Sequence, residues 1–233
     1  EVYRIPYEVK PLDEDFRIRP EDYRQPNGGV VFPNPNAPTG VLMPLHAVEE
    51  IVKNNRDVVV IVDEAYIDFG GTSALPLIEK YDNLLVVQTF SKSRSMAGVR
   101  IGYAMGQPQL IRYLNEVKYS VNSYTMNTAA LTLGVEAVRD EAYFEQCCHK
   151  IIQTRTRAEQ ELAQLGFQFP KSYANFIFAS HKSVPAREIF ERLKENDIYV
   201  RWWNKERIEN FLRITIGTDE QMEALYWALE KIV

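Results

Sequence analysis

Hydrophobic residues in the first half of the chain form short continuous runs separated by helical patterns. Three runs occupy residues 29–32, 58–62 and 84–87, and each is followed by polar side chains. Unbroken runs of Val, Ile and Leu are typical of strands buried on both faces of a parallel sheet. Between the first two runs, apolar residues recur at helical spacing across residues 45–52. This alternation predicts strand–helix–strand units, and therefore an α/β fold with a mostly parallel sheet.

The second half of the chain has a different pattern of apolar residues. A fourth strand is expected at residues 101–105, before a helix with Leu110, Leu114 and Val117 on one side. Residues 128–165 contain one glycine and no proline, which predicts one long helix or two successive helices. We expect the chain to be divided into three regions. They are a large domain over residues 1–127, a connecting helical region over 128–165, and a smaller α+β domain over 166–233.

The smaller domain is expected to contain a strand, a helix, a pair of strands and a final helix. Residues 176–178 and 212–216 supply two of its strands. Thr218 and Gln221 have the spacing of a capping box, which predicts that the last helix begins there.

Composition excludes some classes of function. Twenty-seven basic and 32 acidic residues give a net charge of −5, and the basic residues are scattered, so no nucleic-acid or anionic-membrane surface is expected. The longest aliphatic run is far too short to span a bilayer, and nothing resembles a signal peptide, so we expect a cytoplasmic protein. Cys147 and Cys148 are adjacent and fit a reduced compartment and helix packing. The three histidines are isolated, so no metal site is expected.

The first residues of the chain resemble an internal segment of a fold rather than its start. The sequence begins at Glu1 without a Met, and Tyr3 and Ile5 alternate with Arg4 as in a strand. We expect the sequence to be a fragment that lacks an N-terminal portion, although a processed or trimmed chain would look the same.

Lys92 has the surroundings of a chemically active amine. Ser91 and Thr89 lie one and three positions before it, and Arg100 lies eight positions after it. Hydroxyls and an arginine around one lysine form an anion site beside an amine that could form a Schiff base. The alternative is an exposed surface charge.

Asp63 lies at the carboxyl end of the second run, where ligands bind in open α/β sheets. One interpretation is a magnesium site made by Asp63 and Glu64, but its partner phosphate loop, G-x-x-x-x-G-K-[ST], is absent from this sequence. A second is a cofactor site in which Asp63 pairs with a protonated pyridine nitrogen and Tyr66 donates to the phenolic oxygen of the ring. A third is an acidic helix cap.

A third polar segment, residues 34–40, follows the first strand with the sequence Asn-Pro-Asn-Ala-Pro-Thr-Gly. Together with the segments around Asp63 and Lys92, it resembles the fold-type I pyridoxal-phosphate enzymes, specifically the class II aminotransferases. The resemblance covers essentially the whole chain. It implies that pyridoxal 5'-phosphate is the cofactor and that Lys92 forms the internal aldimine and then acts as a base.

The resemblance also implies roles for the neighbouring residues. Asp63 would keep the pyridine nitrogen protonated, so that the ring withdraws electrons, and Tyr66 would tune the phenolic oxygen. Thr89, Ser91 and Arg100 would bind the cofactor phosphate.

This sequence departs from the family pattern at one position. The residue before Pro-Thr-Gly is usually Asn and in this chain is Ala37, so Asn36 is the candidate to replace it. A one-residue shift normally redirects a side chain, and one lost hydrogen bond to a charged group costs about 1.5–3 kcal/mol.

Two arginines in the smaller domain are candidates for binding the substrate. Arg213 lies in Leu-Arg-Ile-Thr-Ile-Gly-Thr, and Arg201 lies twelve positions earlier, on an expected neighbouring strand. Two arginines suit a phosphate better than a single carboxylate, whereas the alternative is a pair of strand-edge charges. This arrangement resembles the histidinol-phosphate aminotransferase group of the family.

That resemblance implies transamination of histidinol phosphate with 2-oxoglutarate and glutamate, by a ping-pong mechanism in histidine biosynthesis. It also implies a homodimer, with a phosphorylated amine and a 2-oxo acid as its small-molecule partners. Two alternatives stay open. They are a pyridoxal-phosphate enzyme like threonine-phosphate decarboxylase, and an aminotransferase-like regulatory domain that senses the cofactor without turnover.

Overall fold

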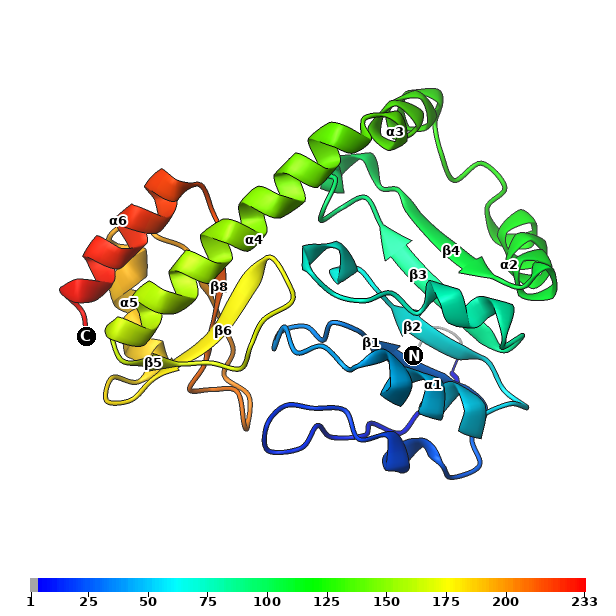
Figure 1. Ribbon diagram of the computed structural model, residues 1–233, viewed down its shortest axis with the longest axis horizontal. Coiled ribbons are helices and arrows are strands. Elements are labelled where there is room, and N and C mark those ends of the chain that lie inside the picture. Colours follow the sequence, from blue (N-terminus) through cyan, green and yellow to red (C-terminus); the bar gives the residue numbers. More distant parts are fainter. Residues whose placement is uncertain (1–3) are drawn as a thin grey trace.

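The computed structural model describes residues 4–233 and contains two sheets and a long helix, α4 (Glu141–Gln164), that packs with the second sheet. Figure 1 shows the first sheet beside helices α1 and α2, and the second sheet beside α5 and α6, with α4 running from α3 to the second sheet. None of the helices in the described residues is both long and apolar enough to cross a bilayer.

The first sheet has four strands in chain order, of which the first three are parallel and the fourth is antiparallel to its neighbour. The expected α/β class with a mostly parallel sheet is therefore confirmed. The strands are β1 (Val30–Pro33), β2 (Val60–Asp63), β3 (Leu84–Thr89) and β4 (Gly102–Gly106).

The strands of this sheet alternate in burial, and the expectation that they are buried on both faces is wrong for β1 and β2. Helix α1 (Leu45–Asn54) covers one face, where Val30 and Val60 are almost fully buried. The next residues along each strand point to the other face, where Val31 is 67% exposed and Ile61 is partly exposed. In the described residues, no comparable layer covers that second face around Val31.

Short 3-10 helices and α2 (Pro108–Val121) complete the first half of the chain. The apolar side of α2 that the sequence predicts is present, but Leu114 and Val117 are 43% and 60% exposed rather than buried. The 3-10 helices are η1 (Pro20–Tyr23), η2 (Ile67–Phe69), η3 (Leu75–Glu79) and η4 (Ala97–Val99).

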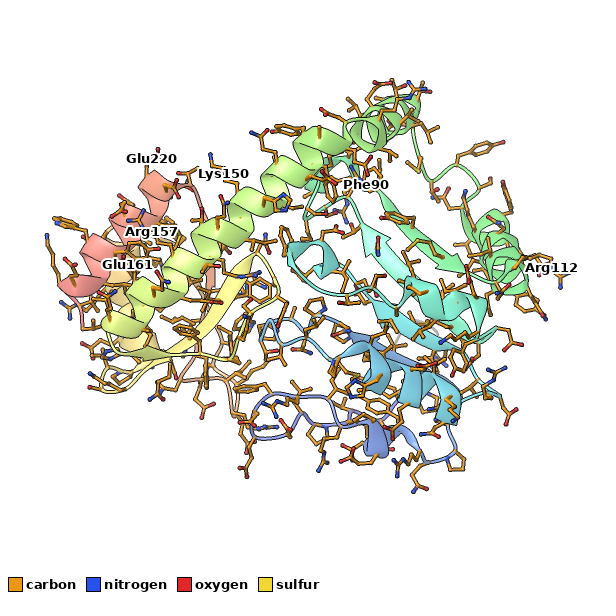
Figure 2. The ribbon with its side chains drawn as sticks, viewed as in Figure 1. Phe90, Arg112, Lys150, Arg157, Glu161 and Glu220 are labelled. Atoms are coloured by element: carbon orange, nitrogen blue, oxygen red, sulfur yellow. The ribbon has the colours of Figure 1, made fainter. Side chains whose placement is uncertain are left out.

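The connecting region contains two successive helices, α3 (Thr128–Arg139) and α4, so the second of the two expected forms is present. They are separated at Asp140, whose side chain accepts a hydrogen bond from the Tyr143 backbone N–H at 3.3 Å and so caps α4. Figure 2 shows the charged side chains of Lys150, Arg157 and Glu161 on the part of α4 that lies beside α6.

The second sheet is antiparallel, with the strand order β5-β6-β8-β7. Its core includes Ile177, Ile189 and Leu193, all fully buried. Thr218 and Gln221 form the predicted capping box, with both of its hydrogen bonds present. The elements are β5 (Phe167–Gln168), β6 (Phe176–His181), α5 (Ala186–Glu195), β7 (Arg201–Trp202), β8 (Leu212–Thr215) and α6 (Asp219–Glu230).

Each sheet has its own buried cluster, and we propose that residues 1–127 and 166–233 form two domains joined by residues 128–165. The N-terminal segment nevertheless contacts the second sheet, since the Phe16 ring packs edge-on against Phe178 at 5.5 Å. Of the strand expected near the start, Tyr3 lies outside the described residues, and Arg4 and Ile5 have no regular structure.

Candidate active site

The carboxyl ends of β1, β2 and β3 meet at one edge of the first sheet. Pro33 pairs with Asp63, and Asp63 with Val87, in the parallel register. The Asn34 N–H donates to the Asp63 carbonyl, and the Glu64 N–H to the Val87 carbonyl, both at 2.8 Å. The three polar segments that the sequence singled out therefore begin side by side.

Asp63 and Glu64 face different surroundings although they are adjacent. Asp63 is exposed, and its carboxylate accepts a hydrogen bond from the Ala65 N–H at 3.0 Å. Glu64 is 1% exposed and accepts three hydrogen bonds, from Ser73 Oγ, the Ala74 N–H and Gln88 Nε2. Burial raises the pKa of Glu64, although these bonds oppose the shift.

The two carboxylates therefore do not converge on one ligand, as a magnesium site made by both would require. In the part of the chain that the structure describes, no group of three or more His, Cys, Asp or Glu side chains could hold a metal ion.

Lys92 is held against Tyr66. Its Nζ lies 5.3 Å from the centre of the Tyr66 ring, within reach of a cation–π contact. The neighbouring Ser93 hydroxyl donates to the carboxylate of Asp68, which lies on η2 just after Tyr66. Asp68 was not predicted from the sequence, because its role depends on the contact between two segments about 25 residues apart.

Thr89, Ser91 and Arg100 come together at the base of the β3–β4 hairpin, where Thr89 pairs with Gly102. The Thr89 hydroxyl donates to the Ile101 carbonyl and accepts from the Ser91 N–H, both at 3.1 Å, so it mainly holds the turn. Arg100 is exposed, adopts a φ of 63°, and uses one N–H on the Ala97 carbonyl at 2.8 Å. The Ser91 hydroxyl and the remaining Arg100 N–H groups are the donors that an anion could use at this hairpin.

The Asn36 side chain is hydrogen-bonded within the loop that contains it. Its Oδ1 accepts a hydrogen bond from the Thr39 hydroxyl at 2.8 Å. The loop is fixed by buried Asn34, whose amide exchanges hydrogen bonds of 2.8 and 3.1 Å with the Met43 backbone. Among the described residues, no hydrogen bond joins Asn36 to Lys92 or Asp63. The structure thus places Asn36 in the loop after β1, with its amide oxygen bonded within that loop.

A line of aromatic rings connects Lys92 with the two arginines. The Tyr66 ring meets Phe176 edge-on with centroids 5.1 Å apart, and the Arg213 guanidinium lies 5.2 Å from the Phe176 ring. The Trp203 ring lies 5.5 Å from the guanidinium of Arg213 and 5.4 Å from that of Arg201. This line runs from β2 and its following loop in the first sheet to β7 and β8 in the second. A series of contacts therefore links the Lys92 amine with the arginine pair.

Arg201 and Arg213 lie directly opposite each other on β7 and β8, which confirms that they are on neighbouring strands. In the described residues, neither guanidinium has a carboxylate within 4.0 Å. The Arg213 Nε is buried and has no hydrogen-bond partner. A buried donor without a partner is costly, so this side chain is prepared to receive an acceptor.

Phe176 and Trp203 were not identified from the sequence as members of the site. Trp203 could have been found from strand alternation, because it lies two residues after Arg201 and therefore on the same face. Phe176 offered no such signal, since its contact with Tyr66 depends on how the two sheets are placed.

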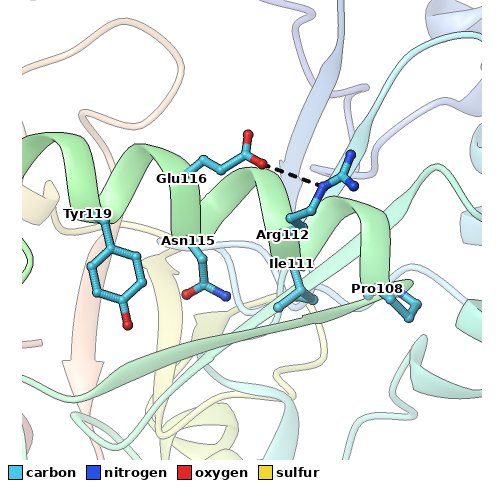
Figure 3. A pocket seen from close by; sticks show the side chains of 7 residues that line it. Pro108, Ile111, Arg112, Asn115, Glu116 and Tyr119 are labelled. Atoms are coloured by element: carbon cyan, nitrogen blue, oxygen red, sulfur yellow. Dashed lines mark ion pairs between the residues drawn. The ribbon is translucent and has the colours of Figure 1, made fainter.

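A separate groove of about 680 Å³ lies beside α2 and contains none of the predicted site residues. Figure 3 shows Pro108, Ile111 and Tyr119 along one side of the helix, with the Arg112–Glu116 ion pair at 3.5 Å on the other. This groove has no cluster of reactive side chains, and the site at the strand ends is the stronger candidate for chemistry.

The match to a protein family identifies the class of protein to which this chain belongs. Residues 1–229 match the family Aminotransferase class I and II, and the chain belongs to this family. The chain is 52% identical to histidinol-phosphate aminotransferase 2 of Dechloromonas aromatica over 99% of its own length, but it spans only 65% of that relative.

Solved structures show the same fold. The histidinol-phosphate aminotransferase of Clostridium acetobutylicum superimposes with a TM-score of 0.88 at 25% identity, covering 95% of this chain and 69% of that one. The enzyme of the same name from Sinorhizobium meliloti, in complex with pyridoxal-5'-phosphate, has a TM-score of 0.86 at 26% identity, covering 97% and 63%.

Proposed function

We propose that this protein is a pyridoxal-phosphate-dependent aminotransferase that transfers the amino group between histidinol phosphate and 2-oxoglutarate in histidine biosynthesis. The similarity to relatives of that name supports the substrate assignment. The observation that carries the proposal is the line of contacts from Lys92 through Tyr66 and Phe176 to Arg213, because it joins an amine to an anion-binding pair.

The side chains present fit this cofactor. Lys92 supplies the amine that holds its carbonyl end, and exposed Asp63 supplies a carboxylate for the protonated ring nitrogen. The Tyr66 hydroxyl is the donor for the phenolic oxygen, and the Ser91 hydroxyl and Arg100 are the donors for the phosphate. Thr89 contributes by shaping the turn between them. Asn36 remains a candidate for the phenolic oxygen, for which it would have to turn its amide out of the loop.

When bound, the cofactor supplies a carbonyl that exchanges for the substrate amino group and a ring that withdraws electrons. The chain itself supplies the proton transfers and the orientation. Lys92 Nζ is the base that removes and returns the proton at the substrate Cα, because this amine lies against the Tyr66 ring. Tyr66 lies against Lys92, so it orients that amine as well as donating its own hydroxyl.

Arg201 and Arg213 hold the far end of the substrate. A phosphate dianion can accept from both guanidiniums at once, and it also satisfies the buried Arg213 Nε. The second half-reaction needs a carboxylate of the 2-oxo acid at the same place. One arginine pair therefore serves both substrates, which a ping-pong mechanism allows because they occupy the site in turn.

The proposed assembly is a homodimer in the cytoplasm. Supporting it, α2 and α3 expose several large apolar side chains that a partner surface could cover. Both cysteines are free, as is usual for a cytoplasmic protein. Light scattering during size exclusion, with the protein expressed from its complete reading frame, measures the assembly directly. The exposed residues are Leu114, Val117, Val121, Leu131, Leu133, Val135 and Val138.

The proposal is tested by turnover of the protein expressed from its complete reading frame and loaded with cofactor. Histidinol phosphate and 2-oxoglutarate should give stoichiometric glutamate. Release of carbon dioxide from threonine phosphate, without consumption of 2-oxoglutarate, would instead assign a decarboxylase. Cofactor binding without either reaction would assign a regulator.

A further inference from the structure

We propose that Trp203 is a positioning residue that holds the guanidiniums of Arg201 and Arg213 at a fixed spacing, so that both face one phosphate dianion. The inference rests on the proposed function, since the dianion is the phosphate of the substrate. It goes further by assigning the geometry of the anion subsite to an aromatic side chain that contacts both guanidiniums.

The problem that Trp203 solves is the repulsion between two like charges. Arg201 and Arg213 are directly opposite on antiparallel strands, which places their Cβ atoms about 4.5–5.5 Å apart on one face of the sheet. Like charges in that position are destabilising and drive the flexible side chains apart. In the described residues, no carboxylate lies within 4.0 Å of either guanidinium to neutralise the pair.

The Trp203 ring offers both guanidiniums an attractive surface. It lies 5.4 Å from the Arg201 guanidinium carbon and 5.5 Å from that of Arg213, and both distances are within cation–π range. Because one rigid ring contacts both cations, it fixes their separation as well as offsetting their repulsion. A flexible aliphatic side chain at this position would do neither.

The backbone at Trp203 is fixed by its neighbour. The Trp202 indole N–H donates to the Glu209 carbonyl at 2.7 Å, and its ring packs near Phe190 beside the core of the second domain. Successive residues of an extended segment point to opposite faces. Trp202 therefore anchors the segment, while Trp203 is left on the face of the arginines.

The chain provides a matched control in Trp227. It is 58% exposed on α6, and the Lys231 amine lies over its ring, so it also makes a cation–aromatic contact. Figure 1 shows α6 at the end of the molecule away from the first sheet. Replacing Trp227 removes such a contact without touching the proposed subsite.

The test is calorimetric titration of inorganic phosphate into the full-length, cofactor-loaded protein, in which the bound cofactor occupies the other phosphate site. Trp203→Leu should weaken phosphate binding about tenfold, because two cation–π contacts are lost. Trp203→Phe should restore most of the affinity, and Trp227→Leu should leave it unchanged. Trp203→Met tests the same point if Trp203→Leu does not fold.

Steady-state kinetics supply a second readout that a structural role alone would not produce. In Trp203→Leu the KM for histidinol phosphate should rise about tenfold while kcat stays within about twofold. Phosphate affinity unchanged in Trp203→Leu or Trp203→Met, but lost in Arg213→Gln, would overturn the role of Trp203 and leave the proposed function standing. If the wild type binds no phosphate, or if Arg213→Gln binds as well as the wild type, the anion subsite itself is overturned.

Discussion

At the scale of single residues, the two adjacent acids at the end of β2 lie in different surroundings. Asp63 is exposed and accepts one hydrogen bond within the described residues, from the Ala65 N–H, whereas Glu64 is buried and accepts three. The sequence showed that an acid stands at the strand end, but not which of the two faces the ligand. Alternation along the strand places the two side chains on opposite faces, and the hydrogen bonds from Ser73 and Gln88 show that Glu64 points inward.

Replacing Asp63 with Asn should reduce turnover and leave the fold intact. The Asn side chain is neutral and stabilises a protonated ring nitrogen less than a carboxylate does, so a charged hydrogen bond worth about 1.5–3 kcal/mol is lost and turnover falls about 10- to 100-fold. The free energy of unfolding should stay within about 0.5 kcal/mol, as for other exposed positions. Asp57→Asn, also exposed, is the control and should keep full activity. Equal activities of the two variants in a glutamate-release assay would rule out the role of Asp63.

Most of the proposed cofactor-binding residues could be predicted from the sequence, because strand ends and short spacings place them. Lys92, Thr89, Ser91 and Arg100 lie within one hairpin, so local sequence already brings them together. Phe176 was not visible as a site residue, because its contact with Tyr66 joins two sheets that are distant in sequence.

At the scale of elements, the start of helix α4 and the burial of strand β1 depend on contacts that the sequence pattern does not show. The sequence predicted the helical region and left open whether it was one helix or two. The break at Asp140 depends on a capping contact to Tyr143, which composition alone does not reveal. In the first sheet, continuous apolar runs suggested two buried faces, yet the structure buries one face of β1 and leaves Val31 open. The hydrophobicity of a strand shows that its faces can be buried. It does not show which helices or strands cover each face.

The two adjacent cysteines of α4 should differ in reactivity. Cys148 is 6% exposed, and burial raises the pKa of its thiol to about 11, whereas Cys147 is partly exposed. Since only the thiolate reacts, alkylation of Cys148 should be slow at neutral pH and accelerate as the pH rises toward 11. Peptide mass spectrometry after iodoacetamide treatment measures both sites. Equal labelling of both cysteines at neutral pH, with the protein folded, would contradict the burial of Cys148.

At the scale of the whole molecule, Arg155 joins the two proposed domains. Its guanidinium is buried and donates to the Phe69 carbonyl at 2.9 Å and to the Ala174 carbonyl at 2.7 Å. Phe69 lies three residues after Tyr66, and Ala174 lies two before Phe176. Arg155 therefore fixes the two segments whose aromatic rings meet in the candidate site.

Arg155→Gln should destabilise the protein strongly. Two buried carbonyls and the nearby Glu159 carboxylate would lose their partner, which costs about 3 kcal/mol. Arg157→Gln, two residues further along the same helix, breaks an exposed ion pair with Glu223 and should cost less than about 1 kcal/mol. Urea unfolding followed by circular dichroism compares the two. A similar small loss in both variants would show that the domains are held together elsewhere.

The central claim is that Lys92 is the amine that binds the cofactor. The most direct measurement is the visible absorbance of the protein, expressed from its complete reading frame and loaded with pyridoxal 5'-phosphate, for wild type, Lys92→Ala and Lys53→Ala. Lys53 is an exposed lysine at the end of α1 and serves as the control. We expect Lys92→Ala to lack the band of the lysine-bound cofactor and to be inactive, while Lys53→Ala matches the wild type. A normal band in folded Lys92→Ala would contradict the account.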